Sequence, residues 1–420
     1  MNTQTPAQKQ RNQSVLFTQI FIGALALLIV LAGITPRLLG FAPTVIAIIG
    51  YLSYRPIFGV WPRISRYAMF WAITISTLAL ISSLWAIEPT LAIERGYKNL
   101  TILGSGAILF SIANALPSAY LKSTKIILPA CLILAGILAL FELYFGGNIH
   151  QMLRPNAPEE ATFNVSKLNR GLIVYALSLF IVIPLLLFNS QARTTKIKIL
   201  SIIAIITALI IYRTDSQSAI LSILIGSLIL FLFPYKKKIA WYILVIGLLT
   251  TLAITPFLAQ YLFQTMATDI GNISWLEQSY ATARLEIWDF VSRYAINSPL
   301  YGHGIEATRV IEDFDTKMLY ENEQMILHPH NFSVQIWIEF GVAGILIAGL
   351  FFSHLISQIY KSGRIFGKNS HHVYLPTLCA TIAVSATGYG LWQGWWLGCF
   401  MLLLSLSTIA VRSLPSKSEQ

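Results

Sequence analysis

A histidine at the entrance to an apolar helix is the residue best placed for acid–base chemistry in this chain. His330 stands where a long hydrophilic loop meets the apolar stretch Phe332–Gln358, and an imidazole can take or give a proton near neutral pH. On an ideal helix, Gly341 and Gly344 fall near the same face as His330, and glycines let a neighbouring helix approach closely in lipid. We therefore predict that this face packs inside a bundle and holds a catalytic imidazole at the outer mouth of a membrane-embedded cleft. The alternative is a helix-start histidine that only hydrogen-bonds to backbone.

An arginine and a tryptophan one helical turn apart form the second candidate group. Arg284 and Trp288 lie on a stretch, Thr282–Ala295, that reads as an amphipathic helix, so their side chains share a face. A guanidinium offers a planar fork of donors that suits phosphate oxygens, and an indole could stack on a sugar ring or shield the site. Spacing alone favours a simpler interpretation, a local ion pair of Arg284 with Glu286 or Asp289.

Three further arginines stand where apolar stretches meet the outer loops. Arg213 ends the seventh stretch and is a functional candidate, although Asp215 is close enough in sequence to neutralise it. Arg170 and Arg95 occupy similar positions, where an arginine more commonly anchors a helix than binds a ligand.

The sequence predicts neither a metal site nor a cofactor. His303, His328 and His330 share one outer loop, but their spacing lacks the His-x-x-x-His pattern of a helical metal site. The 3 cysteines, Cys131, Cys379 and Cys399, fall in apolar stretches and read as small packing residues. The first apolar run lacks a signal-peptidase pattern and reads as an uncleaved anchor.

Composition indicates an integral membrane protein. Of the 420 residues 55% are hydrophobic and 11% are charged, and apolar runs recur almost end to end. We predict an all-α polytopic membrane protein with about twelve transmembrane helices and a large outer loop that itself contains helices. The expected spans are Val15–Ile34, Phe41–Tyr54, Tyr67–Trp85, Leu100–Leu116, Ile126–Phe145, Gly171–Phe188, Ile199–Tyr212, Ser218–Pro234, Ile239–Thr255, Phe332–Gln358, Val373–Tyr389 and Trp395–Val411.

Charge asymmetry predicts the orientation, with both termini in the cytoplasm. Basic residues concentrate on the cytoplasmic side of membrane proteins, and this rule also explains the net charge of +11 without nucleic acid. The same charges would favour anionic lipid headgroups. Eighteen of the 29 basic residues fall on the predicted inside: Lys9, Arg11, Arg55, Arg63, Arg66, Lys122, Lys125, Arg193, Lys196, Lys198, Lys236, Lys237, Lys238, Lys361, Arg364, Lys368, Arg412 and Lys417.

The outer loops divide the chain into three parts. Residues 1–255 carry the first nine predicted helices, residues 256–329 form the large outer loop, and residues 330–420 carry the last three. A loop as long as 256–329 within a compact protein is usually functional or disordered, and its tryptophans and tyrosines favour function. Its first part, Pro256–Met266, is apolar enough to lie along the outer membrane surface.

Two motifs in this order resemble those of the O-antigen ligase family. His330-Asn331, nine residues, and then Gly341-Val342-Ala343-Gly344 is similar to the family's His-Asn/Ser/Gln-x9-Gly-x-x-Gly signature. The segment from Arg284 through Trp288 to Pro299-Leu300-Tyr301-Gly302-His303-Gly304 resembles its Arg-x-x-x-Trp…Pro-x-x-Gly-x-Gly segment.

The resemblance implies a GT-C-like glycosyltransferase of the bacterial inner membrane. Such enzymes move a glycan from undecaprenyl diphosphate to lipid A–core on the periplasmic side, without a metal. By residue-level analogy, Arg284 would hold the donor diphosphate and His330 would act as base or position the acceptor. Asn331, Trp288, Gly341, Gly344 and His303 would support them.

The chain departs from the family at a Ser-Arg pair where a middle helix meets the periplasm. It reads Ser216-Gln217-Ser218-Ala219 there, so Arg213 or Arg170 would supply the second phosphate-binding cation. Three alternatives remain open: a polysaccharide polymerase, a protein O-oligosaccharyltransferase of the same superfamily, and a polyprenyl-glycan transporter. A transporter would need ionisable residues along a mid-membrane pathway, and the chain has few, Glu142 and Glu339.

Overall fold

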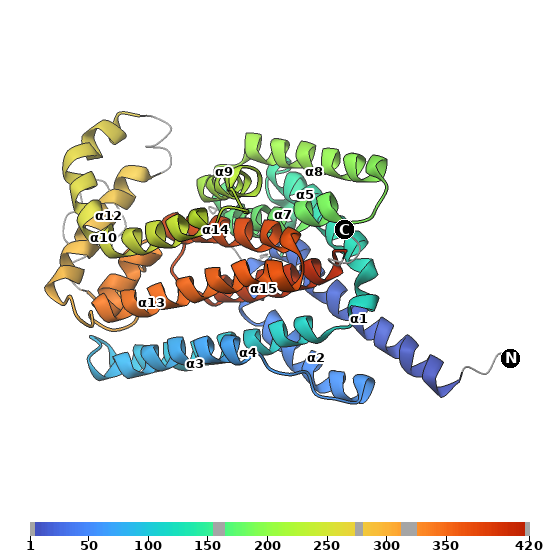
Figure 1. The fold of residues 1–420 in the computed structure, drawn as a ribbon. Helices are drawn as coiled ribbons and strands as arrows, with labels where there is room; N and C mark the ends of the chain where they lie inside the picture. The colour runs from blue at the N-terminus through green and yellow to red at the C-terminus, as the bar shows by residue number, and fades with distance from the viewer. Residues whose placement is uncertain (1–4, 154–163, 274–279, 312–325, 416–420) are drawn as a thin grey trace.

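The computed structural model describes residues 5–153, 164–273, 280–311 and 326–415, and in these ranges the chain is helical and without strands (Figure 1). Its α-helices are α1 (Pro6–Ala32), α2 (Ala42–Phe58), α3 (Arg66–Ile81), α4 (Pro89–Ala115), α5 (Thr124–Tyr144), α6 (Asn148–Met152), α7 (Asn169–Phe188), α8 (Arg193–Arg213), α9 (Gln217–Leu232), α10 (Lys238–Gly271), α12 (Ala281–Asn297), α13 (Phe332–Ile365), α14 (His371–Thr387) and α15 (Gly394–Ser413).

The helices fit a polytopic membrane protein. Lipid offers no partners for backbone N–H and C=O groups, so a chain that crosses it satisfies them within helices. Each of the twelve predicted spans falls on one of the helices of the described structure. Among the described residues, eight helical segments are long and apolar enough to cross a membrane by length and composition, and α9 is a shorter apolar helix. The all-α membrane class is therefore confirmed, whereas the number twelve stays a prediction.

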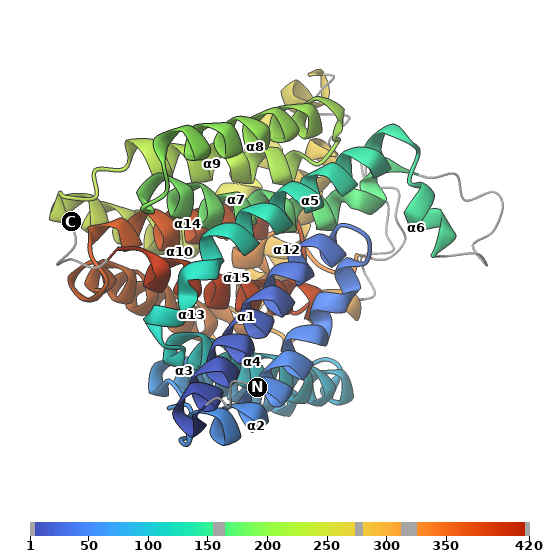
Figure 2. The ribbon, with the colours of Figure 1, turned by 90° about the vertical axis from the view of Figure 1, so that its right-hand side faces the viewer.

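The core of the bundle forms around α7 and α15. Both helices are buried along most of their length, and Phe180 of α7 and Trp396 of α15 are among the largest fully buried side chains. Helices α8 and α9 lie along one side of this centre and α2, α3 and α4 along the other (Figures 1 and 2). Large apolar side chains such as Ile205 on α8 and Phe70 on α3 point outward, as expected of helices that face lipid.

One stretch folds differently from the prediction. Pro256–Met266 does not start a loop, because α10 continues through it without interruption from Lys238 to Gly271. A helix of 34 residues is about 51 Å long, well beyond the hydrocarbon thickness of a bilayer. Its far end packs against α12, the helix predicted at Thr282–Ala295 (Figure 1). The rest of the predicted loop includes residues 274–279 and 312–325, which lie outside the described ranges.

Glycine allows two chain segments to touch beside the central helix α15. The 3₁₀ turn η1 (Pro36–Gly40) lies against α15, and a Cβ atom placed on Gly398 would sit 1.7 Å from the carbonyl oxygen of Leu39. That oxygen belongs to the backbone of a turn whose Leu39 side chain is itself fully buried, so it cannot move aside cheaply.

Gly398→Ala should destabilise the protein by about 1–3 kcal/mol or more, the usual cost of overpacking a tight interior. Thermal unfolding in detergent, followed with a thiol-reactive dye that reports exposure of the three cysteines, would measure this loss. Gly104→Ala is the matched control, since a Cβ at this helical glycine meets nothing within 4 Å. Equal melting temperatures for the two variants would contradict the packing explanation.

Candidate active site

The imidazole of His330 is held by the backbone of a distant loop. His330 precedes α13 and has a left-handed backbone conformation, with φ of +54°. Its Nδ1 hydrogen-bonds to the carbonyl oxygen of Gly388, which can only accept, so Nδ1 carries the proton. In the neutral ring the lone pair then lies on Nε2, the nitrogen that can receive a proton. The next residue, Asn331, caps α13 by accepting from the backbone N–H groups of Ser333 and Val334.

A second imidazole lies against the first. The ring centroids of His328 and His330 are 4.2 Å apart. The Trp395 Nε1–H donates to Gln393 Oε1, which orients the Gln393 amide so that its NH2 donates to Nε2 of His328. Burial and the nearby His330, Arg309 and Arg170 lower the pKa of His328 to about 3, so this ring stays neutral.

Two arginines from distant helices converge on Tyr389. The guanidinium of Arg170, at the start of α7, lies 5.7 Å from the ring centroid of Tyr389 and 5.5 Å from that of Trp395. Arg284, on α12, is half-buried and also interacts electrostatically with Tyr389. Burial raises the pKa of Tyr389 to about 12, and both guanidinium charges oppose that rise. Tyr389 therefore lies near both cations, in ring contact with Arg170 and within the electrostatic range of Arg284.

The local ion pair that spacing favours for Arg284 is not formed with Asp289. Both oxygens of that carboxylate accept from Arg293 instead, each at 2.9 Å. None of the three ion pairs formed within the described ranges includes Arg284. Burial lowers the pKa of this guanidinium, because a charge in a half-buried position loses part of its hydration.

The other two outer arginines have different surroundings. Arg213 is exposed at the end of α8 and lies 5.0 Å from the ring centroid of Tyr144 on α5. No contact described for it reaches Tyr389 or His330. Arg95 pairs at 2.8 Å with the buried carboxylate of Glu306, which is the anchoring role considered for it.

The two sequence motifs bind each other at a break in α13. The helix is interrupted at Gly341, which has φ of +57° and ψ of −149°. The segment 298–304 fills the break with four backbone hydrogen bonds. His303 N donates to Ile338 O and Gly304 N to Glu339 O, while Pro299 O and Leu300 O accept from Val342 N and Ala343 N. The motif Pro-x-x-Gly-x-Gly thus supplies the partners that the broken helix lacks.

This arrangement corrects the prediction of one continuous helix face. His330 lies before α13 begins, and the break separates it from Gly344, so the three residues do not form a helical stripe. A Cβ on Gly341 would lie 2.4 Å from Pro299 O, and one on Gly302 would lie 2.5 Å from Ile338 O. The glycines permit a loop, rather than a neighbouring helix, to approach. Near Gly344 the crowded atoms belong to α13 itself.

A buried carboxylate ties the break to two other segments. Glu339 is fully buried and accepts from Gln335 Nε2 at 2.9 Å, from Glu306 N at 3.0 Å and from Trp392 Nε1. Gln335 Oε1 in turn accepts from Leu391 N at 2.8 Å. A carboxylate with three donors is well satisfied in a nonpolar interior. Glu339 therefore positions the loop after α12 and the loop after α14 relative to α13.

The remaining predicted residues have structural roles here. His303 Nε2 hydrogen-bonds to Tyr294 O at 3.0 Å, within the docked loop. Trp288 packs at the edge of a cluster formed by α10, α12 and α13, and its buried Nε1 has no hydrogen-bond partner among the described residues. Across the same ranges, no group of three His, Cys, Asp or Glu side chains has the arrangement of a metal site.

Sequence reasoning missed the loop between α14 and α15. Gly388, Tyr389, Trp392 and Gln393 all contact the site, yet they follow His330 by more than fifty residues. The composition of residues 387–396 could have indicated this loop, because it contains several glycines, aromatic residues and a glutamine between two apolar runs. Together the elements place two guanidinium groups and an imidazole with a basic Nε2 at one end of the bundle. That set can bind phosphate oxygens and accept a proton from a hydroxyl.

Gly341→Ala should detach segment 298–304 from α13, because alanine disfavours the positive φ and its methyl group would collide with Pro299 O. Hydrogen–deuterium exchange of the amides of His303 and Gly304 should become faster. Gly247→Ala, at an open position on α10, should leave their exchange unchanged. Unaltered protection in Gly341→Ala would contradict the docking described above.

The buried neutral His328 should make the protein sensitive to acid. The folded-state pKa of about 3 lies below the unfolded value of about 6.5, so the unfolded chain binds the proton more tightly between them. Stability is then complete above about pH 6.5 and falls as the pH drops toward 3. Denaturant unfolding at a series of pH values should show that the free energy of unfolding falls less steeply with decreasing pH for His328→Gln than for the unsubstituted protein. An identical dependence of the free energy of unfolding on pH in the two proteins would contradict the assignment of this acid sensitivity to His328.

Comparison with known proteins agrees with the geometry. Residues 202–349, from α8 to the middle of α13, match a family model described as O-antigen ligase. Proteins named "Putative polysaccharide ligase" are similar over most of the chain. The one from Rickettsia conorii is 24% identical over 336 residues, 79% of this chain and 77% of that protein. The one from Rickettsia bellii is 25% identical over 363 residues, 82% of each.

The match includes Arg284, His330 and Gly341 and ends before the Tyr389 loop. The family points to a ligase-like glycosyltransferase, and the helices to a multi-pass membrane protein. As the two motifs predicted, the chain resembles the O-antigen ligase family, which its residues 202–349 match directly.

Proposed function

We propose that the protein transfers a glycan from undecaprenyl diphosphate to lipid A–core at the periplasmic face of the bacterial inner membrane. The observation that carries this proposal is the convergence of Arg170 and Arg284 on Tyr389, next to the paired rings of His328 and His330. Two cations beside a potential base match the needs of a diphosphate-linked donor and a hydroxyl acceptor.

The arginines would bind the donor diphosphate. Arg284 is half-buried and takes part in none of the three ion pairs of the described residues. Its guanidinium can therefore direct its N–H donors at phosphate oxygens. We propose Arg170 as the second cation, since it shares Tyr389 with Arg284, whereas Arg213 lies over Tyr144. Charge on the departing diphosphate grows as its bond to the sugar lengthens, and fixed cations stabilise that charge without a metal.

His330 would serve the acceptor. The acceptor hydroxyl oxygen forms the new bond to the anomeric carbon while the bond from that carbon to the phosphate oxygen breaks. The hydroxyl proton passes to Nε2 of His330, whose tautomer is fixed by Gly388 O, and undecaprenyl diphosphate departs with the bonding electrons. Holding both substrates in line supplies much of the acceleration.

The charge pattern supports the proposed membrane placement. With the basic segments in the cytoplasm, the ends of α7, α12 and α13 that carry Arg170, Arg284 and His330 face the periplasm. Both termini would then be cytoplasmic. A lipid-anchored donor would reach the site from the bilayer while its head group meets water.

Two of the alternatives are transferases that use a different acceptor, and the third is a transporter that catalyses no transfer. A polymerase or a protein O-oligosaccharyltransferase would use the same donor site with a different acceptor hydroxyl. A transporter would need mobile ionisable groups within the bundle. Glu142 accepts from the backbone N–H groups of Ile149 and His150, and Glu339 is held by three donors, so both carboxylates have structural partners.

Purified protein should transfer glycan from undecaprenyl diphosphate to lipid A–core with EDTA present. Arg284→Gln and Arg170→Gln should each lower kcat/KM by roughly 10²–10³-fold, as for loss of one charge-stabilising donor. His330→Asn should lower kcat by roughly 10²–10⁴-fold, as for loss of a general base. Asparagine tolerates the left-handed backbone of this position, so the fold should survive the change.

Arg37→Gln is the matched control, an exposed arginine of the 3₁₀ turn η1 on the same predicted face. Arg213→Gln tests the other candidate for the second phosphate-binding cation. Because we assign that role to Arg170, this variant should retain activity. If the glycan is instead transferred to another carrier-linked glycan or to a protein, the proposed donor site stands and lipid A–core is the wrong acceptor. Full activity of His330→Asn or Arg284→Gln would exclude the proposed roles.

A further inference from the structure

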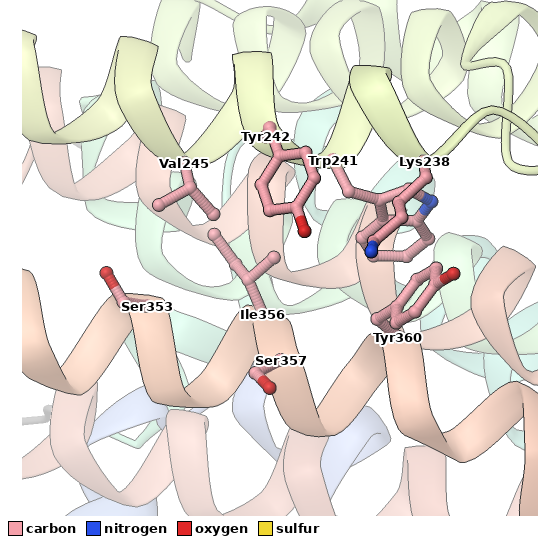
Figure 3. A pocket seen from close by; sticks show the side chains of 8 residues that line it. All are labelled: Lys238, Trp241, Tyr242, Val245, Ser353, Ile356, Ser357 and Tyr360. Carbon is pink, nitrogen blue, oxygen red and sulfur yellow. The ribbon is translucent and has the colours of Figure 1, made fainter.

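A groove opens between α10 and α13 at the end of the bundle opposite the candidate active site. Its volume is about 290 Å³ (Figure 3). Both helices line it, with four residues of each facing the space: Lys238, Trp241, Tyr242 and Val245 from α10, and Ser353, Ile356, Ser357 and Tyr360 from α13. On α13, Tyr360 is 19 residues, or about 29 Å, beyond the break at Gly341, which lies between it and His330.

The polarity of the groove changes along its length. Lys238 and Tyr360 lie at the basic end, where the Lys238 ammonium lies 5.4 Å from the Tyr242 ring centroid. Val245 and Ser353 lie two turns further along their helices, about 10 Å deeper. Buried Trp241 and Ile356 supply apolar surface between the two ends. A cationic mouth and an apolar floor match a molecule with an anionic head and a hydrocarbon tail.

No ion pair among the described residues balances the positive charge at the mouth. The positive charges of Lys238 and Arg364 repel each other electrostatically, and Arg364 is exposed on the last turn of α13. The sequence has no Asp or Glu from residue 216 to 268, nor from 340 to 418. None of the three ion pairs in the described ranges includes Lys238 or Arg364. An external anion is therefore favoured here.

The mouth of the groove lies at the cytoplasmic surface in the predicted orientation. Lys236 and Lys237 immediately precede Lys238, and Lys361 lies beside Tyr360 in the sequence. The cytoplasmic leaflet carries anionic lipids, which attract Lys and Arg at this level. A phospholipid of that leaflet would enter sideways from the bilayer, with its phosphate at the mouth.

We propose that the groove binds an anionic phospholipid of the cytoplasmic leaflet, with its phosphate between Lys238 and Arg364 and an acyl chain along Trp241, Val245 and Ile356. The hydroxyl group of Tyr242, beside the Lys238 ammonium, donates to a phosphate oxygen. The lipid fills the space between α10 and α13, the two helices that also hold the loops of the candidate active site. It binds at the face opposite the transferred glycan and does not depend on the proposed reaction.

Native mass spectrometry of the full-length protein, supplied with equimolar phosphatidylglycerol and phosphatidylethanolamine, tests the proposal. The protein should retain phosphatidylglycerol in preference. The double variant Lys238→Gln/Arg364→Gln should bind it about 25-fold more weakly, about fivefold for each cation removed. Ser357→Trp should also abolish retention, because it fills the groove and leaves the charge unchanged. A thermal unfolding curve confirms that each variant is folded.

Lys122→Gln/Lys125→Gln is the matched control, which removes two cations from the same predicted face at a distant position and should retain the lipid. Equal loss in this control, or retention by Ser357→Trp, would mean unspecific attraction to the basic face and would overturn the proposal. Displacement of the lipid by glycerol 3-phosphate would show that phosphate alone is recognised and would overturn the assignment of the groove to an acyl chain. Unchanged retention in the Lys238→Gln/Arg364→Gln variant would also exclude the site.

Discussion

The insertion of segment 298–304 into the break of α13 is the interaction on which the candidate site depends. A helix that opens inside a membrane protein exposes carbonyl and amide groups that lipid cannot satisfy. Here the loop after α12 supplies two donors and two acceptors, and Gly341 and Gly302 permit the backbones to touch. The same contact fixes α12, and with it Arg284, relative to the helix that follows His330.

A buried polar network extends that contact to the rest of the bundle. Glu339 receives hydrogen bonds from three segments, and Glu306 connects the docked loop to Arg95 on α4 and to Arg309. Charges buried in a nonpolar interior are stable only when paired or fully hydrogen-bonded. The network therefore favours one arrangement of the outer loops and places the cations and the imidazole at fixed separations.

Residue types made part of this site predictable from sequence. Arg284 and His330 stand out because each is ionisable and borders an apolar run, and the helix over Thr282–Ala295 follows from its periodicity. The break at Gly341 could not be predicted, since glycines three residues apart satisfy both a helix–helix contact and a loop-docking role. Only the positive φ of Gly341 separates these two interpretations.

Tertiary contacts made the other part inaccessible to sequence reasoning. Arg170 and Arg213 both stand at helix ends with similar neighbours, and only packing places Arg170 against Tyr389. The all-α membrane class was predictable because lipid imposes an apolar composition over about twenty residues. The prediction was wrong at Pro256–Met266, where the apolar stretch continues α10 instead of starting a loop, because composition does not record where a helix ends.

The loop between α14 and α15 also gives the site a place in the order of synthesis. Gly388 O orients His330, Leu391 N and Trp392 Nε1 bond to Gln335 and Glu339, and Gln393 orients His328. A chain emerging from the ribosome inserts its N-terminal part first. The geometry of the candidate site therefore forms only after the loop between α14 and α15 has been made, and a shorter chain has the two motifs but not the site.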